Sequence, residues 1–125
     1  MSQRVLIAED DAAMADTLRE LLAETGFDVL VAASGAELQE RLVGEGPFDL
    51  VVADIGLPWV NGLQAMHRAR WHGVRTPVVF VTGHDDPKLE DWVAAFGPGA
   101  SLLHKPFSGE ALLDAARRLA PPPQR

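Results

Sequence analysis

"FDLVVADIGLPWVNG", residues 48–62, joins an apolar run to a single acid and then to a loop. The run "LVVADI" at 50–55 has the length of a β-strand, and its nearly continuous apolar residues are typical of a parallel strand covered on both faces. The strand ends at Asp54, and Gly, Pro, Trp and Asn residues follow. Because a buried carboxylate without a partner is costly, this acid calls for a functional explanation.

Four further stretches have the same strand character. They are "RVLIAE" (4–9), "DVLVAA" (28–33), "PVVFVT" (77–82) and "SLLHK" (101–105). Longer amphipathic stretches separate them. In the first of these, apolar residues recur at helical spacing and Gly26 stands where a C-terminal cap is wanted; the apolar residues are Met14, Leu18, Leu21 and Leu22.

Capping residues mark the other predicted helices. "SGAE" at 34–37 predicts a capping box, in which Ser34 accepts from the backbone and Glu37 reaches back. A third helix is predicted from Gly62 to His72, closed by Gly73. The fourth helix is predicted to have Asp86 as its cap, Pro87 at its first position and Gly97 at its end. The fifth is predicted to have Ser108 as its cap and to run through Leu119.

Five strands that alternate with five helices predict an α/β domain with a parallel sheet. Right-handed crossovers and this chain length favour a doubly wound, three-layer (βα)5 sandwich in the flavodoxin-like strand order 2-1-3-4-5. In such sheets ligands bind outside the carboxyl ends of the strands, near the switch point between strands 1 and 3. The functional residues are therefore expected at that edge.

Length and composition fit a single domain. The chain has 125 residues, 47% of them apolar, and no cysteine. We expect a folded domain over residues 1–120 and a Pro-rich tail or linker start over 121–125. "MSQRVLIAEDD" at the N-terminus has too short an apolar run for a signal peptide or a membrane segment, which predicts a cytoplasmic protein without membrane insertion.

A net charge of −7 argues against direct nucleic-acid binding, which requires a basic face. The locally basic stretch "HRARWHGVR" at 67–75 is explained by a solvated helix face followed by a turn. A protein partner is expected instead.

The predicted strands carry polar residues at their carboxyl ends: Glu9, Asp10 and Asp11 after strand 1, Asp54 on strand 3, Thr82 on strand 4 and Lys105 on strand 5. Carboxylates packed together repel, and a hard divalent cation relieves that repulsion. Oxygen ligands without a nearby His or Cys favour Mg²⁺ over zinc. A carboxylate, a metal site, a lysine and a hydroxyl together suit phosphoryl transfer, with Asp54 as the nucleophile.

The chain resembles the receiver domain of two-component response regulators. Four separate motifs carry the resemblance, in the family's order: "AEDD" (8–11), "DIGLPWVNG" (54–62), "VTG" (81–83) and "HKPF" (104–107). It extends from Arg4 to Leu119, almost the whole chain. The resemblance implies a phosphoacceptor domain that assists its own phosphotransfer and dephosphorylation, rather than an enzyme acting on a separate substrate.

The resemblance also assigns roles to residues. Asp54 would accept a phosphoryl group from a phosphohistidine on a sensor kinase or a histidine phosphotransfer protein. Mg²⁺ would be bound by Asp54, Asp10, Glu9 and the backbone carbonyl of Gly56. Thr82, Gly83 and Lys105 would bind the phosphoryl group and report its arrival. The Lys105–Pro106 bond is expected to be cis, as it is in the family.

One position departs from the family pattern. The family has Tyr or Phe three residues before the lysine, whereas this chain has Leu102. Leucine offers no hydroxyl and less area to move, so the coupling is weaker or runs through another residue. Phe107 and Trp92 are candidates for that role.

Several other residues are considered for packing, capping or functional roles. Asp11 is expected to cap the first helix. Trp59 is either a packing residue or a partner contact, whereas Trp71 and Trp92 are expected in helix packing. His84 is either a solvated loop residue or a group that controls the lifetime of the phosphorylated state. By the resemblance, partners would dock on Ala12, Ala15, Arg19, Pro106 and Phe107.

The resemblance leaves the wider context open. The chain is expected to be a stand-alone receiver that binds a downstream target, and the alternatives are a receiver excised from a larger regulator or hybrid kinase, or a degenerate receiver that works without phosphorylation. An Asp-dependent phosphatase is disfavoured because position 56 is Gly where a second acid would be needed. A flavin or dinucleotide binder is disfavoured because "AEDDAAM" places acids where cofactor phosphates would bind.

Overall fold

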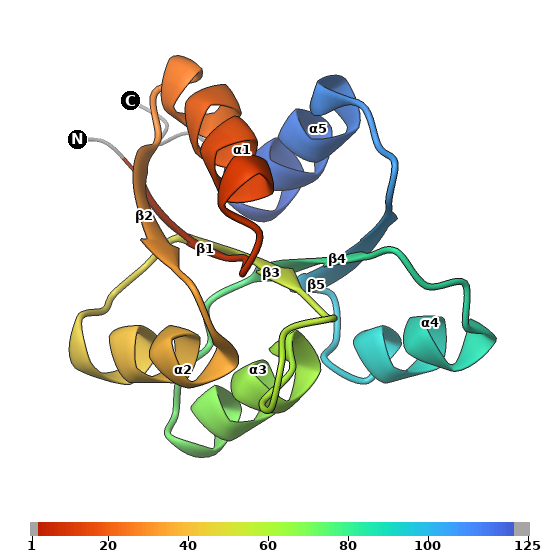
Figure 1. Ribbon diagram of the computed structural model, residues 1–125. Coiled ribbons are helices and arrows are strands. Elements are labelled where there is room, and N and C mark those ends of the chain that lie inside the picture. The colour runs from red at the N-terminus through yellow and green to blue at the C-terminus, as the bar shows by residue number, and fades with distance from the viewer. Residues whose placement is uncertain (1–2, 122–125) are drawn as a thin grey trace.

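In the computed structural model, which describes residues 3–121, a five-stranded parallel sheet forms the centre of the domain (Figure 1). The strand order β2-β1-β3-β4-β5 confirms the predicted doubly wound fold. The strands are β1 (Arg4–Ala8), β2 (Asp28–Ala32), β3 (Leu50–Asp54), β4 (Val78–Thr82) and β5 (Ala100–His104). The predicted tail falls mainly on residues 122–125, which lie outside the described residues.

Helices cover both faces of the sheet, as predicted for a three-layer sandwich. Figure 1 shows α1 and α5 on one face and α2, α3 and α4 on the other. The helices are α1 (Ala12–Glu24), α2 (Gly35–Gly44), α3 (Gly62–Trp71), α4 (Pro87–Ala94) and α5 (Gly109–Leu119). No helix among the described residues has the length and apolar character needed to cross a bilayer.

The sheet separates two apolar cores. One packs residues of α2, α3 and α4 against the sheet, and the other packs residues of α1 and α5 against its opposite face. Every residue of β3 and of β4 is buried. The prediction from the nearly continuous apolar runs, that both faces of the sheet are covered, is therefore confirmed. This packing holds the carboxyl ends of β3 and β4 in fixed positions.

Four strands, β1, β2, β3 and β5, end one residue earlier than predicted, and for three of them the next residue still bonds to the sheet. Glu9, Ile55 and Lys105 each follow the last residue of a strand, and the backbone N–H of each still donates one hydrogen bond to the neighbouring strand. The distances from N to O are 3.0 Å for Glu9, 2.9 Å for Ile55 and 2.7 Å for Lys105. Each residue is thus anchored by the sheet but belongs to the loop that follows.

Side-chain caps open three helices as predicted. The Asp11 carboxylate accepts from the backbone N–H groups of Ala13 and Met14 at 3.0 and 3.3 Å. Asp86 and Ser108 cap α4 and α5 in the same way. Because Asp11 is occupied as the cap of α1, Asp10 is left for another role.

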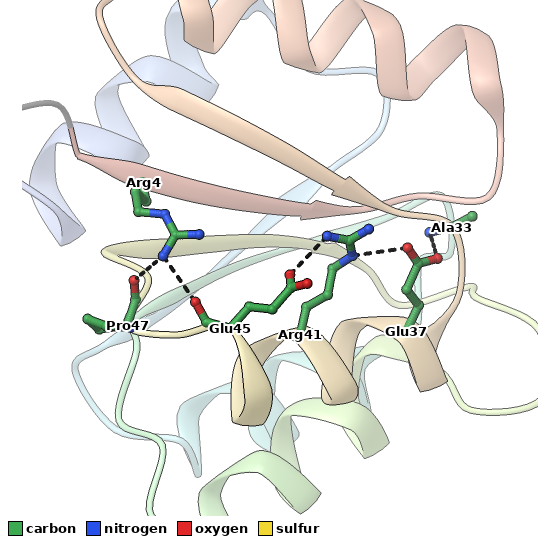
Figure 2. Close-up of polar contacts among 6 residues, drawn as sticks. All are labelled: Arg4, Ala33, Glu37, Arg41, Glu45 and Pro47. Carbon is green, nitrogen blue, oxygen red and sulfur yellow. Dashed lines mark hydrogen bonds and ion pairs between the residues drawn. The ribbon is translucent and has the colours of Figure 1, made fainter.

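The capping box predicted at the start of α2 is only half formed. The Ser34 hydroxyl accepts from the N–H of Glu37 at 3.1 Å, as predicted. The Glu37 carboxylate, however, reaches past Ser34 and accepts from the N–H of Ala33 at 3.0 Å (Figure 2). Arg41, one turn later, donates to Glu37 at 3.0 Å and to Glu45 at 2.9 Å (Figure 2).

Candidate functional site

The candidate site lies where the carboxyl ends of β1, β3, β4 and β5 meet. Asp54 is the last residue of β3 and Thr82 the last residue of β4. Glu9 and Asp10 directly follow β1, and Lys105 directly follows β5. The parallel sheet therefore brings residues from distant parts of the sequence to one edge, as expected for this topology.

Three carboxylates form a cluster at this edge. Glu9, Asp10 and Asp54 each offer an oxygen atom, and these atoms lie within 4.8 Å of one another. Glu9 and Asp54 are buried, with 3% and 8% of their surface exposed, whereas Asp10 is exposed. One side of the cluster thus faces solvent and the other faces the core.

Lys105 balances part of the negative charge. Its Nζ lies 3.0 Å from Oδ2 of Asp54 and 3.8 Å from Oε2 of Glu9. Burial would raise the pKa of Asp54, but Glu9, the N–H of Gly56 and Lys105 outweigh that effect and lower it. Burial would lower the pKa of Lys105, but Asp54 and Glu9 raise it instead. At neutral pH Asp54 is a carboxylate and Lys105 an ammonium group.

Glu9 is the least satisfied member of the cluster. Burial raises its pKa to about 7, and the nearby Asp54 carboxylate acts in the same direction. Its Oε2 atom is buried without a hydrogen-bond partner among the described residues. Since buried polar atoms are normally paired, this oxygen marks a place for a ligand.

The donor set fits Mg²⁺. The cluster supplies only oxygen atoms, one of them orphaned, and the exposed carboxylate of Asp10 leaves a side open to solvent. Mg²⁺ binds through one or two carboxylates and keeps several waters, so a half-open site of this kind suits it. The part assigned to the backbone carbonyl of Gly56 stays a prediction; the contact that Gly56 makes with Asp54 is an N–H donated to Oδ1 at 2.8 Å.

The loop after β3 is held close to Asp54. A Cβ atom added at Gly62 would lie 2.5 Å from the backbone oxygen of Asp54, so only glycine fits there. The helix that follows begins with a capping box that sequence inspection missed, in which Asn61 and Gln64 accept from each other's backbone N–H at 2.8 and 3.1 Å. The Asn-x-x-Gln spacing was the available signal. Loop and helix together fix the position of Asp54.

Thr82 is fully buried beside the site, and its position is tied to two neighbours. Its hydroxyl oxygen accepts from the N–H of His84 at 3.0 Å, and its backbone oxygen accepts from the N–H of Lys105 at 2.7 Å. Gly83 and His84 are exposed in the loop after β4. The structure thus brings Thr82 next to Lys105 and leaves His84 at the solvent side.

The Leu102 position lies on the α4 side of the sheet. Leu102 is half-buried, pairs with Phe80 in the sheet register and packs against the core under α2, α3 and α4. Phe107 packs against the opposite core, under α1 and α5. The Lys105–Pro106 peptide bond is cis, as predicted.

One residue of the expected docking surface is inaccessible. Ala15 is 5% exposed, because it belongs to the stripe of α1 that faces the sheet. Its inclusion in the partner surface was wrong. Ala12, Arg19 and Pro106 are exposed and Phe107 is half-buried, so these four remain available.

All three tryptophans are exposed: 99% for Trp59, 82% for Trp71 and 51% for Trp92. The expectation that Trp71 and Trp92 pack between helices was therefore wrong. Smaller residues occupy the buried stripes of α3 and α4; they are Gly62, Ala65, Met66 and Ala69 on α3, and Leu89 and Val93 on α4. Trp59, in the loop after Asp54, has a positive φ of 65°, unusual for a bulky residue.

Most of the chain matches one family of known proteins. A sequence profile described as the response regulator receiver domain matches residues 5–117. The chain is 38% identical over 117 residues to the response regulator protein PmrA of Pseudomonas aeruginosa, covering 93% of this chain and 52% of that protein. The chain thus spans about half the length of the curated relatives it matches.

Solved structures agree with this match. A response regulator receiver domain protein, described as CheY-like, from Methanospirillum hungatei superposes with a TM-score of 0.85 at 25% identity, covering 94% of this chain and 93% of that one. A response regulator receiver protein from Sinorhizobium medicae superposes with a TM-score of 0.82 at 30% identity, covering 95% and 94%. The fold is shared along nearly the whole chain.

Proposed function

The chain belongs to the response regulator receiver domains, and we propose that it accepts a phosphoryl group on Asp54, with Mg²⁺ bound, as part of two-component signal transduction. The receiver domain is proposed to cover residues 1–120. The observation that carries the proposal is the pair formed by the Asp54 carboxylate and the Lys105 ammonium group, 3.0 Å apart at the carboxyl edge of the sheet. Phosphoryl transfer depends mainly on such positioning and charge neutralisation.

Asp54 is the proposed nucleophile. One of its carboxylate oxygens attacks the phosphorus of a phosphohistidine, and the O–P bond forms as the P–N bond breaks. The electron pair of the broken bond stays on the departing imidazole nitrogen. The product is an acyl phosphate on Asp54, and hydrolysis of that bond by water resets the domain.

Mg²⁺ would be held by Glu9, Asp10 and Asp54, with the Gly56 carbonyl as a further ligand. When bound, it supplies positive charge that offsets the repulsion between the acids and the incoming phosphoryl oxygens. The three carboxylates would be its protein side-chain ligands. Lys105 neutralises part of the charge of Asp54, 3.0 Å away.

Thr82 and Lys105 are the proposed sensors of the phosphoryl group, with Gly83 beside them. The Thr82 oxygen accepts from His84 N–H, so its own hydroxyl proton is available for a phosphoryl oxygen. A turn of the Thr82 side chain toward Asp54 would weaken that contact and move the loop after β4. His84, at the exposed side, is placed to influence the access of water and so the lifetime of the acyl phosphate.

The proposed phosphodonor is a sensor histidine kinase or a histidine phosphotransfer protein. Its docking surface would include Ala12 and Arg19 on α1, and Pro106 and Phe107 after β5. A downstream protein target would recognise the phosphorylated state. With Leu102 in place of an aromatic residue, we expect the change to reach the α4 side of the sheet through packing rather than through a swinging ring.

Intact-mass analysis tests this proposal. The full chain is incubated with acetyl phosphate and Mg²⁺, beside Asp54→Asn and a sample with excess chelator. One phosphoryl adduct is expected on the wild type with Mg²⁺, and none on Asp54→Asn or in the sample with chelator. An Asp114→Asn variant, with its exposed acid on α5, serves as the matched control and should be phosphorylated like the wild type. Absence of an adduct on the wild type would favour a binding module that works without phosphorylation.

A further inference from the structure

A second candidate site lies between α3 and α4, away from the acid cluster. A pocket of about 770 Å³ is lined by residues of α3, of α4 and of the segments next to their ends. None of the carboxylates of the acid cluster lines it. Its volume falls within the range of sites that bind small organic ligands.

Aromatic side chains form part of the pocket wall. Trp92 is half-exposed there, and Phe96 is fixed by packing, with its ring centroid 5.2 Å from that of the fully buried Phe80. The ring of His67 meets Phe96 edge-on, with the ring centroids 6.4 Å apart. Such a wall suits a flat apolar ring.

Two arginines border the same pocket and are held by the backbone. The Nη1 atom of Arg70 donates to the carbonyl oxygens of Val74 and Thr76 at 3.2 and 2.9 Å, and the Nη1 atom of Arg75 donates to those of Arg70 and Val74 at 3.0 and 3.1 Å. The other guanidinium nitrogens of both residues have no hydrogen-bond acceptor among residues 3–121. Their N–H groups are available to a ligand.

The positive charge of these arginines is not balanced locally. Within the described part of the chain, neither Arg70 nor Arg75 forms a salt bridge, as is true of most of the other basic residues there. Burial lowers the pKa of Arg70, and the charge of Arg75 acts in the same direction. In a chain with a net charge of −7, two unpaired guanidinium groups side by side point to an anionic ligand.

The amides at the pocket are also donors. Asn61 and Gln64 use their side-chain oxygens to accept from each other's backbone N–H, and across residues 3–121 their NH₂ groups have no acceptor. No Asp or Glu lines the pocket. Its polar wall therefore offers donors from guanidinium, amide, imidazole and indole groups, and no carboxylate.

We propose that the pocket between α3 and α4 binds a small organic anion that carries an aromatic ring. The ring lies against Trp92 and Phe96, and a carboxylate or phosphate group lies at Arg70 and Arg75. The pocket volume favours a small molecule over a protein segment, and a polar wall with two guanidinium groups and no carboxylate favours an anion.

A matched trio of probes tests this proposal by NMR. Indole-3-acetate is titrated into the ¹⁵N-labelled full chain, beside neutral indole-3-acetamide and ring-free acetate. We expect indole-3-acetate to shift backbone signals of α3 and α4 saturably. The other two probes are expected to bind at least about tenfold more weakly, since each lacks one of the two recognised groups.

Substitutions separate the two parts of the pocket. Arg75→Gln and Trp92→Ala should each weaken the binding of indole-3-acetate by about fivefold. Arg117→Gln on α5 and Trp71→Ala at the end of α3 remove the same groups from exposed positions outside the pocket, and should change the affinity by less than about twofold. Unchanged spectra away from the substituted residue report that each variant is folded.

Three results of the titrations would overturn the proposal. They are equal binding of indole-3-acetamide or acetate, binding that Arg75→Gln leaves unchanged in a folded variant, and shifts that map outside α3 and α4. Signals of α3 and α4 that move with protein concentration alone would assign the pocket to a second copy of the chain, and would also contradict it.

Discussion

The acidic site at the strand tips carries an excess of negative charge and the pocket between α3 and α4 an excess of positive charge, but the two are built differently. In the acidic site Glu9 and Asp54 are buried, and the backbone passes so close that Gly62 tolerates no side chain. In the pocket, the charges of Arg70 and Arg75 sit on half-buried or exposed side chains at the surface. One site is part of the folded core and the other lies on top of it.

Because of this difference, substitutions at the two sites should affect folding stability and ligand binding to different degrees. A change at the acidic site disturbs buried charges and backbone packing, so it should alter the free energy of unfolding as well as ligand binding. A change at the pocket should alter binding with little effect on folding. The following predictions address that contrast.

The largest effect is expected from Gly62→Ala. The added methyl group would clash with the backbone oxygen of Asp54, and the loop would have to move. We expect a loss of about 2–3 kcal/mol in the free energy of unfolding, measured by urea denaturation. Gly44→Ala is the matched control, because an added Cβ there has no atom within 4 Å and the residue ends α2. Equal losses in both variants would contradict a tightly held loop.

Glu9→Gln should show a pH-dependent gain in stability. The pKa of Glu9 is raised in the folded protein to about 7, so the stability it contributes is complete below its ordinary value of 4.5 and is lost as the pH rises through 7. Without metal, the free energy of unfolding of the Glu9→Gln variant should therefore equal that of the wild type near pH 4.5. At pH 8 it should be higher by about 2 kcal/mol. The pKa of Asp54 shifts in the opposite direction. Because this pKa is lowered in the folded protein, Asp54 contributes stability at pH values above its ordinary pKa, and that stability is lost in acid.

Urea denaturation in excess chelator at the two pH values measures this difference. Added Mg²⁺ should reverse it, since the wild type keeps a ligand that the variant lacks. A gain of the same size at both pH values would mean that the charge of Glu9 is not its cause.

Lys105→Met should have a smaller effect on stability and a distinct effect on metal binding. The substitution removes the cation nearest to Asp54, so without metal we expect a loss of about 1 kcal/mol at pH 8. Mg²⁺ should bind more tightly to the variant, because the ammonium group no longer competes for the carboxylates. Calorimetric titration with Mg²⁺ measures the change, and weaker binding would contradict this role for Lys105.

The smallest effect is expected from Arg75→Gln. Arg75 is exposed and donates only to carbonyl oxygens near the end of α3, so the free energy of unfolding should change by less than about 0.5 kcal/mol. The same urea titrations report it. A loss as large as that of Gly62→Ala would place the pocket within the folded core and remove the contrast between the two sites.

Much of the fold was predictable because its signals are local. The strand runs, the caps at Asp11, Asp86 and Ser108, and the order of the strands all followed from periodicity, capping chemistry and the rules for parallel sheets. Four of the five strand ends were off by one residue, since residues such as Glu9 keep one hydrogen bond to the sheet after the strand has ended. Sequence alone does not distinguish the last strand residue from the first loop residue.

The candidate site was predictable as a set of residues but not as an environment. The topology rule brought Glu9, Asp10, Asp54 and Lys105 to one edge, where the structure also places them. The burial of Glu9 and its unpaired oxygen depend on how the loops pack over the edge. No spacing in the sequence encodes that packing.

The pocket could not be predicted, because it depends on how α3 and α4, which are separated by β4 in the sequence, are placed next to each other. The basic stretch at 67–75 suggested a solvated helix face, yet Arg70 is half-buried, with its guanidinium carbon 5.8 Å from the ring centroid of Phe96. The exposure of Trp71 and Trp92 was likewise missed, since helical spacing does not say which apolar residue faces the core. Small residues occupy the buried stripes instead.

The central claim, that Asp54 receives the phosphoryl group, is tested most directly by locating the acyl phosphate. The full chain is treated with acetyl phosphate and Mg²⁺ and then with borohydride, which reduces an aspartyl phosphate to homoserine and releases phosphate. Peptide mass spectrometry then identifies the modified residue. The account predicts homoserine at position 54 alone; homoserine at position 10 or 11, or at no position despite bound Mg²⁺, would contradict it.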